Sequence, residues 1–229
     1  MVQVTDMPLV DLIPENTFDA LSALAGVYAG ADTAMSAFGS ASGVACPSGC
    51  GRCCESFVPD MLPLEAEWMA IWLIRNDPSR AEGLAKSGFS AAERSALSCP
   101  FFHSPGLSHC GIYEGRALVC RLFGFAATRS RNGEPIFAFC RHMPVPRGVS
   151  KRSWKGEEIG TGLGAEPPLM SDLAAQLLAI RPEEGRERRS LVEALPAALQ
   201  RIYLIAGLRS QAFAVADRRD ARASGTHGS

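Results

Sequence analysis

All eight cysteines of this 229-residue chain lie between residues 46 and 140, and four of them fall within nine residues. The dense run, C-P-S-G-C-G-R-C-C, begins at residue 46, and the full set is Cys46, Cys50, Cys53, Cys54, Cys99, Cys110, Cys120 and Cys140. A cluster this dense needs a chemical reason. Disulfides, redox catalysis and metal binding are the three candidates.

The amino-terminal residues argue against a disulfide framework. Residues 1–19 contain four acids and no Lys or Arg, whereas a secretory signal begins with a positive segment and continues as an apolar run. The Ala/Gly/Ser-rich stretch that follows is too weakly apolar to predict a membrane span. We therefore expect a soluble, cytoplasmic protein, in which thiols stay reduced, and metal binding is favoured over disulfides.

The charge balance points to no large charged partner. The chain has 24 acidic and 23 basic residues, so its overall field favours neither nucleic acid nor a membrane surface. The expected partners are metal ions, and a protein partner stays open because no feature identifies one.

The spacing of the dense run suits metal ligands. Cys46-x3-Cys50-x2-Cys53 places three thiols on one tight turn, and Gly49 and Gly51 allow that turn to bend back. Side chains of adjacent residues diverge, so Cys54 is expected either to serve a second site or to be a spare thiol. Eight thiols divide into two sets of four, and each set matches structural zinc or the corners of an iron–sulfur cluster.

Some alternatives and additions remain open within this assignment. One or two of the eight cysteines could be small buried hydrophobic residues instead of ligands. Three histidines near cysteines could replace a thiol, and three arginines adjoin cysteines and could offset thiolate charge: His103, His109, His142, Arg52, Arg121 and Arg141.

An enzyme class with a similar spacing is disfavoured by its context. Radical S-adenosylmethionine enzymes hold a [4Fe–4S] cluster with C-x3-C-x2-C after the first strand of a barrel. Here a helix is expected before the run, no series of strands follows, and Arg52 stands where an aromatic residue is usual.

Helices are predicted on both sides of the cysteine run. Apolar residues spaced by three and four predict a helix over 16–38 that ends at Gly39, and Pro63 begins another that ends at Asp77-Pro78. A short helix begins at Ser90 with the capping box Ser90-x-x-Glu93. Later helices are expected over 171–181 and 186–214, with a break at Pro196.

The middle of the chain is predicted to be less regular. Asn132-Gly133 between two apolar runs predicts a hairpin, and residues 143–170 are interpreted as a Pro/Gly-rich loop. The fold class is therefore mainly α, with an irregular metal-stapled cysteine module that contains a small antiparallel β-hairpin. The predicted division is residues 1–44, an N-terminal helix and connector; 45–145, the metal-binding domain; 146–216, linker and C-terminal helices; and 217–229, a disordered tail.

Longer motifs carry a family resemblance over residues 44–145. The chain resembles the YkgJ-type cysteine-cluster family, also called the CxxCxxCC family, in Cys46-x3-Cys50-x2-Cys53-Cys54, Cys99-Pro100-Phe101-Phe102, Cys110-Gly111-Ile112-Tyr113-Glu114-x-Arg116, Cys120-Arg121-x-Phe123 and Cys140. Ala117 stands where the family usually has Pro, and the first cysteine gap is three residues where the family has two. Neither departure removes a thiol.

The resemblance implies a zinc- or iron-chelating domain whose ligands are the eight cysteines. Flagellin lysine methylases are similar in the same cysteine set, so an iron–sulfur enzyme that modifies a protein or a small molecule is an alternative. A structural zinc module that presents helices to a partner is another. Tyr113, Glu114 and Arg116 lie between two expected ligands, and support of the metal site is favoured over catalysis as their role.

Overall fold

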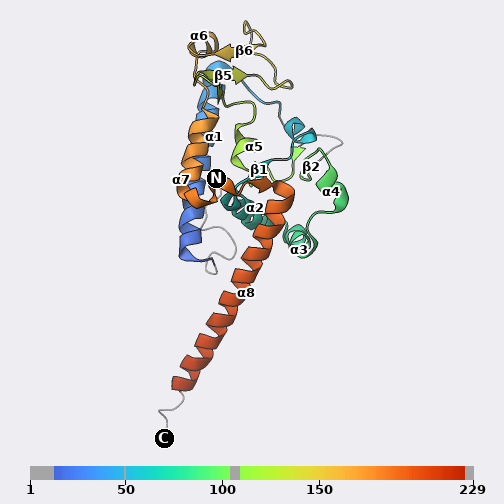
Figure 1. Ribbon diagram of the computed structural model, residues 1–229, viewed down its shortest axis with the longest axis vertical. Coiled ribbons are helices and arrows are strands. Elements are labelled where there is room, and N and C mark those ends of the chain that lie inside the picture. Colours follow the sequence, from blue (N-terminus) through green and yellow to red (C-terminus); the bar gives the residue numbers. More distant parts are fainter. Residues whose placement is uncertain (1–12, 49, 104–108, 225–229) are drawn as a thin grey trace.

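The computed structural model describes residues 13–48, 50–103 and 109–224, with side chains up to Arg209 (Figure 1). Its helices are α1 (Glu15–Ser42), α2 (Pro63–Asn76), α3 (Pro78–Ser87), α4 (Ala91–Ser95), α5 (Leu118–Leu122), α6 (Glu158–Leu163), α7 (Met170–Ile180) and α8 (Leu191–Ser224), and its 3₁₀ turns are η3 (Arg52–Glu55) and η4 (Pro182–Arg186). Its short strands are β1 (Asp60–Met61), β2 (Phe102–His103), β3 (His109–Cys110), β4 (Thr128–Arg129), β5 (Pro135–Ala138), β6 (Ser153–Lys155) and β7 (Arg189–Ser190). The predicted fold class, mainly α with a small cysteine module, is confirmed.

The main core forms around α2, which is buried on nearly every side. α1, α3 and α8 all pack against it, and α8 contributes the fully buried Leu195 and Leu199. β1 pairs antiparallel with β7, so that Asp60 faces Ser190 and the start of α8 is held beside the start of α2. The cysteine run lies directly before β1, which places it at the edge of this core.

α1 is longer than the sequence pattern predicted. It begins after Pro14 and ends at Gly43, whose φ of 73° is the left-handed cap that was expected at Gly39. Gly39 lies inside the helix instead. A Cβ there would lie 2.9 Å from the carbonyl oxygen of Val44, so this glycine allows the returning chain to pass close to α1.

Two further helices differ from the prediction. The sequence reading had no helix at residues 78–87, where α3 begins with Pro78 and is capped by the Asp77 side chain, which accepts a hydrogen bond from the Arg80 N–H. α8 continues through Pro196, because a proline in the second turn gives up only one backbone hydrogen bond. α8 also extends to Ser224, into the segment for which disorder was expected, and residues 225–229 lie outside the described residues.

The predicted hairpin is present, and a third strand joins it. β4 and β5 pair around Asn132-Gly133, with Gly133 at φ 86°, and β6 adds to the far side of β5. The interpretation of residues 143–170 as a loop was wrong, because β6 and α6 lie there. A Cβ on Gly162 would lie 1.9 Å from the Trp154 ring, so glycine is needed for α6 to pack on that ring.

One helical stretch, Leu191–Arg209, is long and apolar enough to cross a membrane by length and composition alone. However, 44% of that stretch is buried inside the molecule. Its buried residues face α2 and α3, so its apolar character is accounted for by the core. Figure 1 shows the rest of α8 extending away from the body.

Candidate metal centre

The cysteines come together from five separate segments of the chain. Seven of the eight line one open cavity of about 600 Å³. The eighth, Cys140, lines an adjoining pocket to which Cys53 also contributes. The set comprises Cys46 and Cys50 in the loop after α1, Cys53 and Cys54 in η3, Cys99 before β2, Cys110 in β3, Cys120 in α5 and Cys140 after β5. The structure therefore brings all eight thiols to two adjoining pockets.

Cys54 is at the centre of one group of thiols. The Cys99 N–H donates to the Cys54 carbonyl at 2.9 Å, and the β2–β3 pairing holds Cys110 opposite Phe102. Hydrogen bonds with Cys110, Cys53 and Cys99 raise the pKa of the Cys54 thiol. The same bonds lower the pKa of Cys99, and lower those of Cys53 and Cys110 to about 7.

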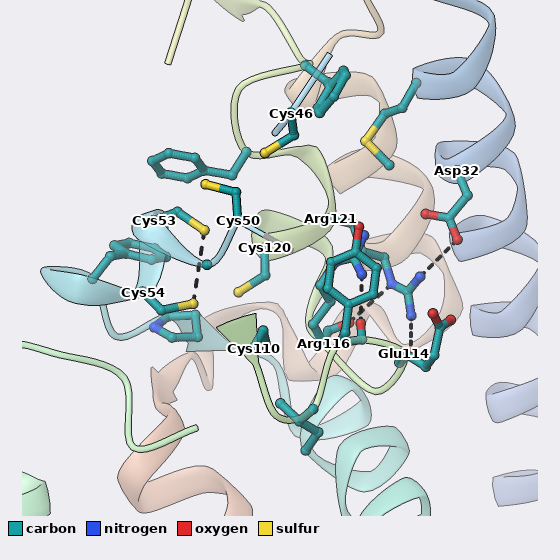
Figure 2. A pocket seen from close by; sticks show the side chains of 18 of the residues that line it. Asp32, Cys46, Cys50, Cys53, Cys54, Cys110, Glu114, Arg116, Cys120 and Arg121 are labelled. Carbon is teal, nitrogen blue, oxygen red and sulfur yellow. Dashed lines mark hydrogen bonds and ion pairs between the residues drawn. The ribbon is translucent and has the colours of Figure 1, made fainter. Parts of the chain in front are cut away.

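Cys46 and Cys50 form the start of a second group. Burial, followed by the charge of Cys50, raises the pKa of Cys46 to about 12, with smaller contributions from Cys140 and Cys53. Figure 2 shows the Cys46 and Cys50 sulfurs pointing toward one another. A tight turn carries this pair, in which the Cys50 N–H donates to the Pro47 carbonyl at 3.0 Å.

Gly51 has a role that differs from the expected one. A Cβ at this position would lie 2.8 Å from the backbone of His109. The cysteine loop therefore packs directly on β3, and only glycine fits at the contact. This close approach brings the dense run of thiols against the strand that carries Cys110.

The adjacent thiols Cys53 and Cys54 do not diverge as expected. Their sulfurs lie 4.0 Å apart, because the 3₁₀ geometry of η3 turns both into the same cavity. In a tetrahedral zinc site with Zn–S bonds of 2.3 Å, two sulfurs would be roughly 3.8 Å apart. This pair therefore has a spacing that one ion could bridge.

Cys99 and Cys110 also lie beside Cys54, but this group is not arranged around one point. Among the residues that the structure describes, no three Cys, His, Asp or Glu side chains lie close enough together to hold one ion as they stand. The thiols line the wall of a cavity and do not converge on a point. Burial, and then the charges of Cys99, Cys110 and Cys53, raise the pKa of Cys120. The donor set is rich in soft sulfur and suits zinc or iron in chemistry, although it is open in geometry.

The histidines and the neighbouring arginines have other partners. His103 and His109 lie at exposed positions on β2 and β3, with ring centroids 5.1 Å apart. His142 lines the pocket of Cys140 and accepts a hydrogen bond from Arg141 at 2.9 Å. Arg52 pairs with Glu55. Arg52 and Arg141 therefore contact other residues, and not the thiols beside them in sequence.

Arg121 is buried and stabilises the chain segments next to the cysteines. Its guanidinium pairs with Asp32 at 2.9 Å, donates to the carbonyls of Arg116 and Glu114, and lies 4.3 Å from the centre of the Tyr28 ring. Sequence adjacency to Cys120 had suggested that it would offset thiolate charge. It instead joins α5 to α1.

Arg116 is the arginine whose charge acts on the thiols. After the hydrogen bond with Cys54, its charge further lowers the pKa of both Cys53 and Cys110. Its guanidinium carbon lies 3.5 Å from the centre of the Tyr113 ring, so the two groups stack. Tyr113 therefore supports the site through this arginine. The family motif contains this residue, but only the fold shows that it faces the cysteines.

Glu65 connects the site to the core. Its buried carboxylate accepts hydrogen bonds from the backbone N–H groups of Leu62 and Leu118 at 3.0 and 2.8 Å, and from the Tyr28 hydroxyl at 3.3 Å. It thereby caps α2 and also holds the first turn of α5, which carries Cys120. The sequence reading treated Glu65 only as an acid in the first turn of a helix.

Comparison with known proteins finds one similarity, which covers the cysteine module. No curated protein and no solved structure matches the chain. The model of the CxxCxxCC family, described as a putative zinc- or iron-chelating domain, matches residues 45–141, which include all eight cysteines. Residues 45–141 therefore match the family that the sequence motifs predicted.

Proposed function

We propose that the protein is a metal-binding protein whose eight cysteines hold iron–sulfur clusters. The observation that carries this proposal is the collection of seven thiols from distant segments around one cavity. Thiols confined together in a reduced chain are the usual ligands of soft metals. Since the cysteines are free, we also propose a reducing location, the cytoplasm.

The spacing of the thiols favours a cluster over single zinc ions. Four thiolates around one zinc converge on a point, whereas those of a cluster stand at its corners and are further apart. The thiols here surround a cavity, and no three of the described ligand-type side chains converge. Zinc is the alternative, and the 4.0 Å separation of the Cys53 and Cys54 sulfurs is the observation on its side.

The contacts support a division of the thiols into two sets. Cys54 bonds to Cys110, Cys53 and Cys99, and the charges of the same three thiols act on Cys120. The charges of Cys50, Cys140 and Cys53 act on Cys46. Cys53 therefore interacts with both groups. We assign Cys54, Cys99, Cys110 and Cys120 to one centre and Cys46, Cys50, Cys53 and Cys140 to another, and the two centres meet at the adjacent Cys53 and Cys54.

Anaerobic purification followed by metal and sulfide analysis tests the proposal. Iron with an equal amount of acid-labile sulfide, together with broad visible absorption, is the expected result. A colourless protein with stoichiometric zinc would show that the cysteines bind zinc and not a cluster. Protein that retains neither metal while all eight thiols remain reduced would overturn metal binding altogether.

A second candidate function is an enzyme that uses the cluster. The observation that favours it is the continuation of the thiol-lined cavity into a wall of charged residues, which include Asp32, Glu114 and Arg116. A site with only a structural role needs no such opening beside it. Resemblance to flagellin lysine methylases makes methyl transfer the reaction to assay first.

A further inference from the structure

The cavity beside the cysteines has the size of a pocket for an organic ligand. Its volume is about 600 Å³, within the range of roughly 300–1,000 Å³ that is typical of small-molecule sites. The cysteines occupy one side of it, and Figure 2 shows Asp32, Glu114, Arg116 and Arg121 on the other. A metal bound by the thiols would account for the first side of the cavity but not for the charged residues on the second side.

One face of α1 forms a part of the cavity wall in which small residues are frequent. The residues that line the cavity there are Asp32, Met35, Ser36, Gly39 and Ser40, which recur at helical spacing. Three of the five have small side chains. This face therefore leaves open space where larger residues would close the cavity.

Aromatic residues lie at the solvent-exposed part of the same cavity. Tyr113 is 55% exposed and Phe123 is 39% exposed, and both are among the few large apolar side chains that the described surface leaves open. Phe57 lies against Phe123, with ring centroids 6.0 Å apart. Exposed rings around a cavity favour a ligand with a flat apolar body.

Arg116 supplies a positive charge with unused hydrogen-bonding capacity. Of its five N–H donors, the Nη1 group bonds to the Tyr113 carbonyl at 2.7 Å, and Nε is buried with no partner within the described part of the chain. A buried donor without an acceptor costs about 1–3 kcal/mol. By contrast, Arg121 is already paired with Asp32.

We propose that this cavity binds an organic anion with a flat apolar body, whose anionic group pairs with Arg116 while its body lies between Tyr113 and Phe123. This proposal extends the second candidate function. It rests on that function in one respect, because the ligand would lie beside the proposed metal centre. The chemistry shown applies equally to a carboxylate, a sulfonate or a phosphate.

Two dyes that differ by one group test the proposal. 8-Anilinonaphthalene-1-sulfonate carries the anion, and N-phenyl-1-naphthylamine has the same rings without it. Fluorescence titration of the metal-loaded protein should show one saturable site that prefers the sulfonate by about tenfold or more, as expected for a charge-assisted contact. Equal affinities for the two dyes would overturn the role of the anion.

Substitutions locate that site. Arg116→Gln should remove the preference for the sulfonate and leave binding of the neutral dye unchanged, and Arg116→Lys should restore part of it. Phe123→Ser should weaken both dyes. The matched control is Leu204→Ser on α8, a surface leucine that is 63% exposed and remote from the cavity, and it should change neither. Loss of binding in the control but not in Phe123→Ser would place the dye elsewhere and overturn the proposal.

The outcome stays separable from that of the metal proposal. Metal content and circular dichroism are measured on every variant. Protein without metal that still binds the dyes as described refutes the metal centre alone, and metal-loaded protein without anion preference refutes the ligand site alone. If the Arg116 variants do not fold, displacement from wild type decides: 1-naphthoate should compete about tenfold better than 1-naphthamide, and equal competition would overturn the proposal.

Discussion

At the scale of single residues, Cys53 and Cys54 are adjacent in sequence but differ in their partners. Cys54 contacts Cys99 and Cys110, whereas Cys53 lies between that group and Cys46. Their sulfurs are 4.0 Å apart, so a charge change at one centre would act directly on the other. The vicinal pair is therefore the place where the proposed assignment of ligands can be tested most directly.

Cys53→Ser and Cys54→Ser should each lower the metal content by affecting different centres. Serine keeps the size of the side chain but is a poorer ligand for soft metals. Metal analysis and visible spectra of the two variants should therefore differ from wild type and from one another. If either substitution leaves both measurements unchanged, that cysteine is a spare thiol and the division into two sets of four is wrong.

Glu65→Ala should destabilise the protein by about 2–5 kcal/mol. The change leaves the buried N–H groups of Leu62 and Leu118 without their acceptor, and each such loss costs about 1–3 kcal/mol. Urea unfolding measures the effect. Glu82→Ala, which removes an exposed pair with Lys86, is the control and should change stability by less than about 0.5 kcal/mol. A loss below about 1 kcal/mol at Glu65 would contradict the anchoring role.

At the scale of secondary-structure elements, local sequence signals predicted where helices begin better than where they end. The capping box at Ser90 and the proline at the start of α2 are local signals, and both elements are present. α1 continues past Gly39 because the tertiary contact with Val44 uses that glycine inside the helix. β6 and α6 were missed because they depend on distant partners: β6 pairs with β5, and Trp154 packs in one cluster with Phe38 of α1 and Phe137 of β5.

The same limit applies to the site. The cysteines could be predicted because thiol spacing is itself the chemical signal. Arg116 was predicted only as one of three residues that support the metal site, and Asp32 was not predicted, because an acid on an amphipathic helix has many ordinary roles. Only the fold brings them to one cavity.

The α4 capping box should make stability depend on acid pH. Partial burial acts to raise the pKa of Glu93, but hydrogen bonds from Ser90 and Arg80 outweigh it and lower the pKa to about 2, from an ordinary 4.5. Because the folded value is the lower one, this contribution is complete above about pH 4.5 and is lost as the pH falls toward 2.

Thermal unfolding of wild type and Glu93→Gln across this range tests that dependence. The melting temperature of wild type should exceed that of the variant near neutral pH, and the difference should shrink below pH 4.5. A difference that is constant across the range would mean that the charge of Glu93 contributes nothing to folding.

At the scale of the whole molecule, the helical core and the cysteine cavity depend on different contacts. α2 and α8 are held together by apolar side chains such as Leu195 and Leu199, together with the ion pair of the buried Glu67 with Arg201. The thiols lie in loops, a 3₁₀ turn and very short elements. We therefore expect the core to fold without metal and the loops to depend on the proposed metal for part of their stability.

Removal of metal with a chelator should loosen the cysteine loops and leave most of the helix content intact. Limited trypsin digestion should then cut near Arg52 and Arg116, while circular dichroism changes little, because α1, α2, α7 and α8 contain most of the helical residues. Full resistance of residues 46–140 after chelation would show that the metal has no structural role.

The pairing of α2 with the carboxyl-terminal part of the chain also sets an order of events during synthesis. The Leu64 N–H bonds to Glu184, which follows it by 120 residues. At ribosomal speeds of about 5–20 residues per second, α2 waits roughly 6–24 s for these partners. The four cysteines of the dense run precede α2 in the chain, and the other four leave the ribosome during that interval. All eight thiols are therefore exposed, and open to metal delivery, before the carboxyl-terminal helices pack against α2.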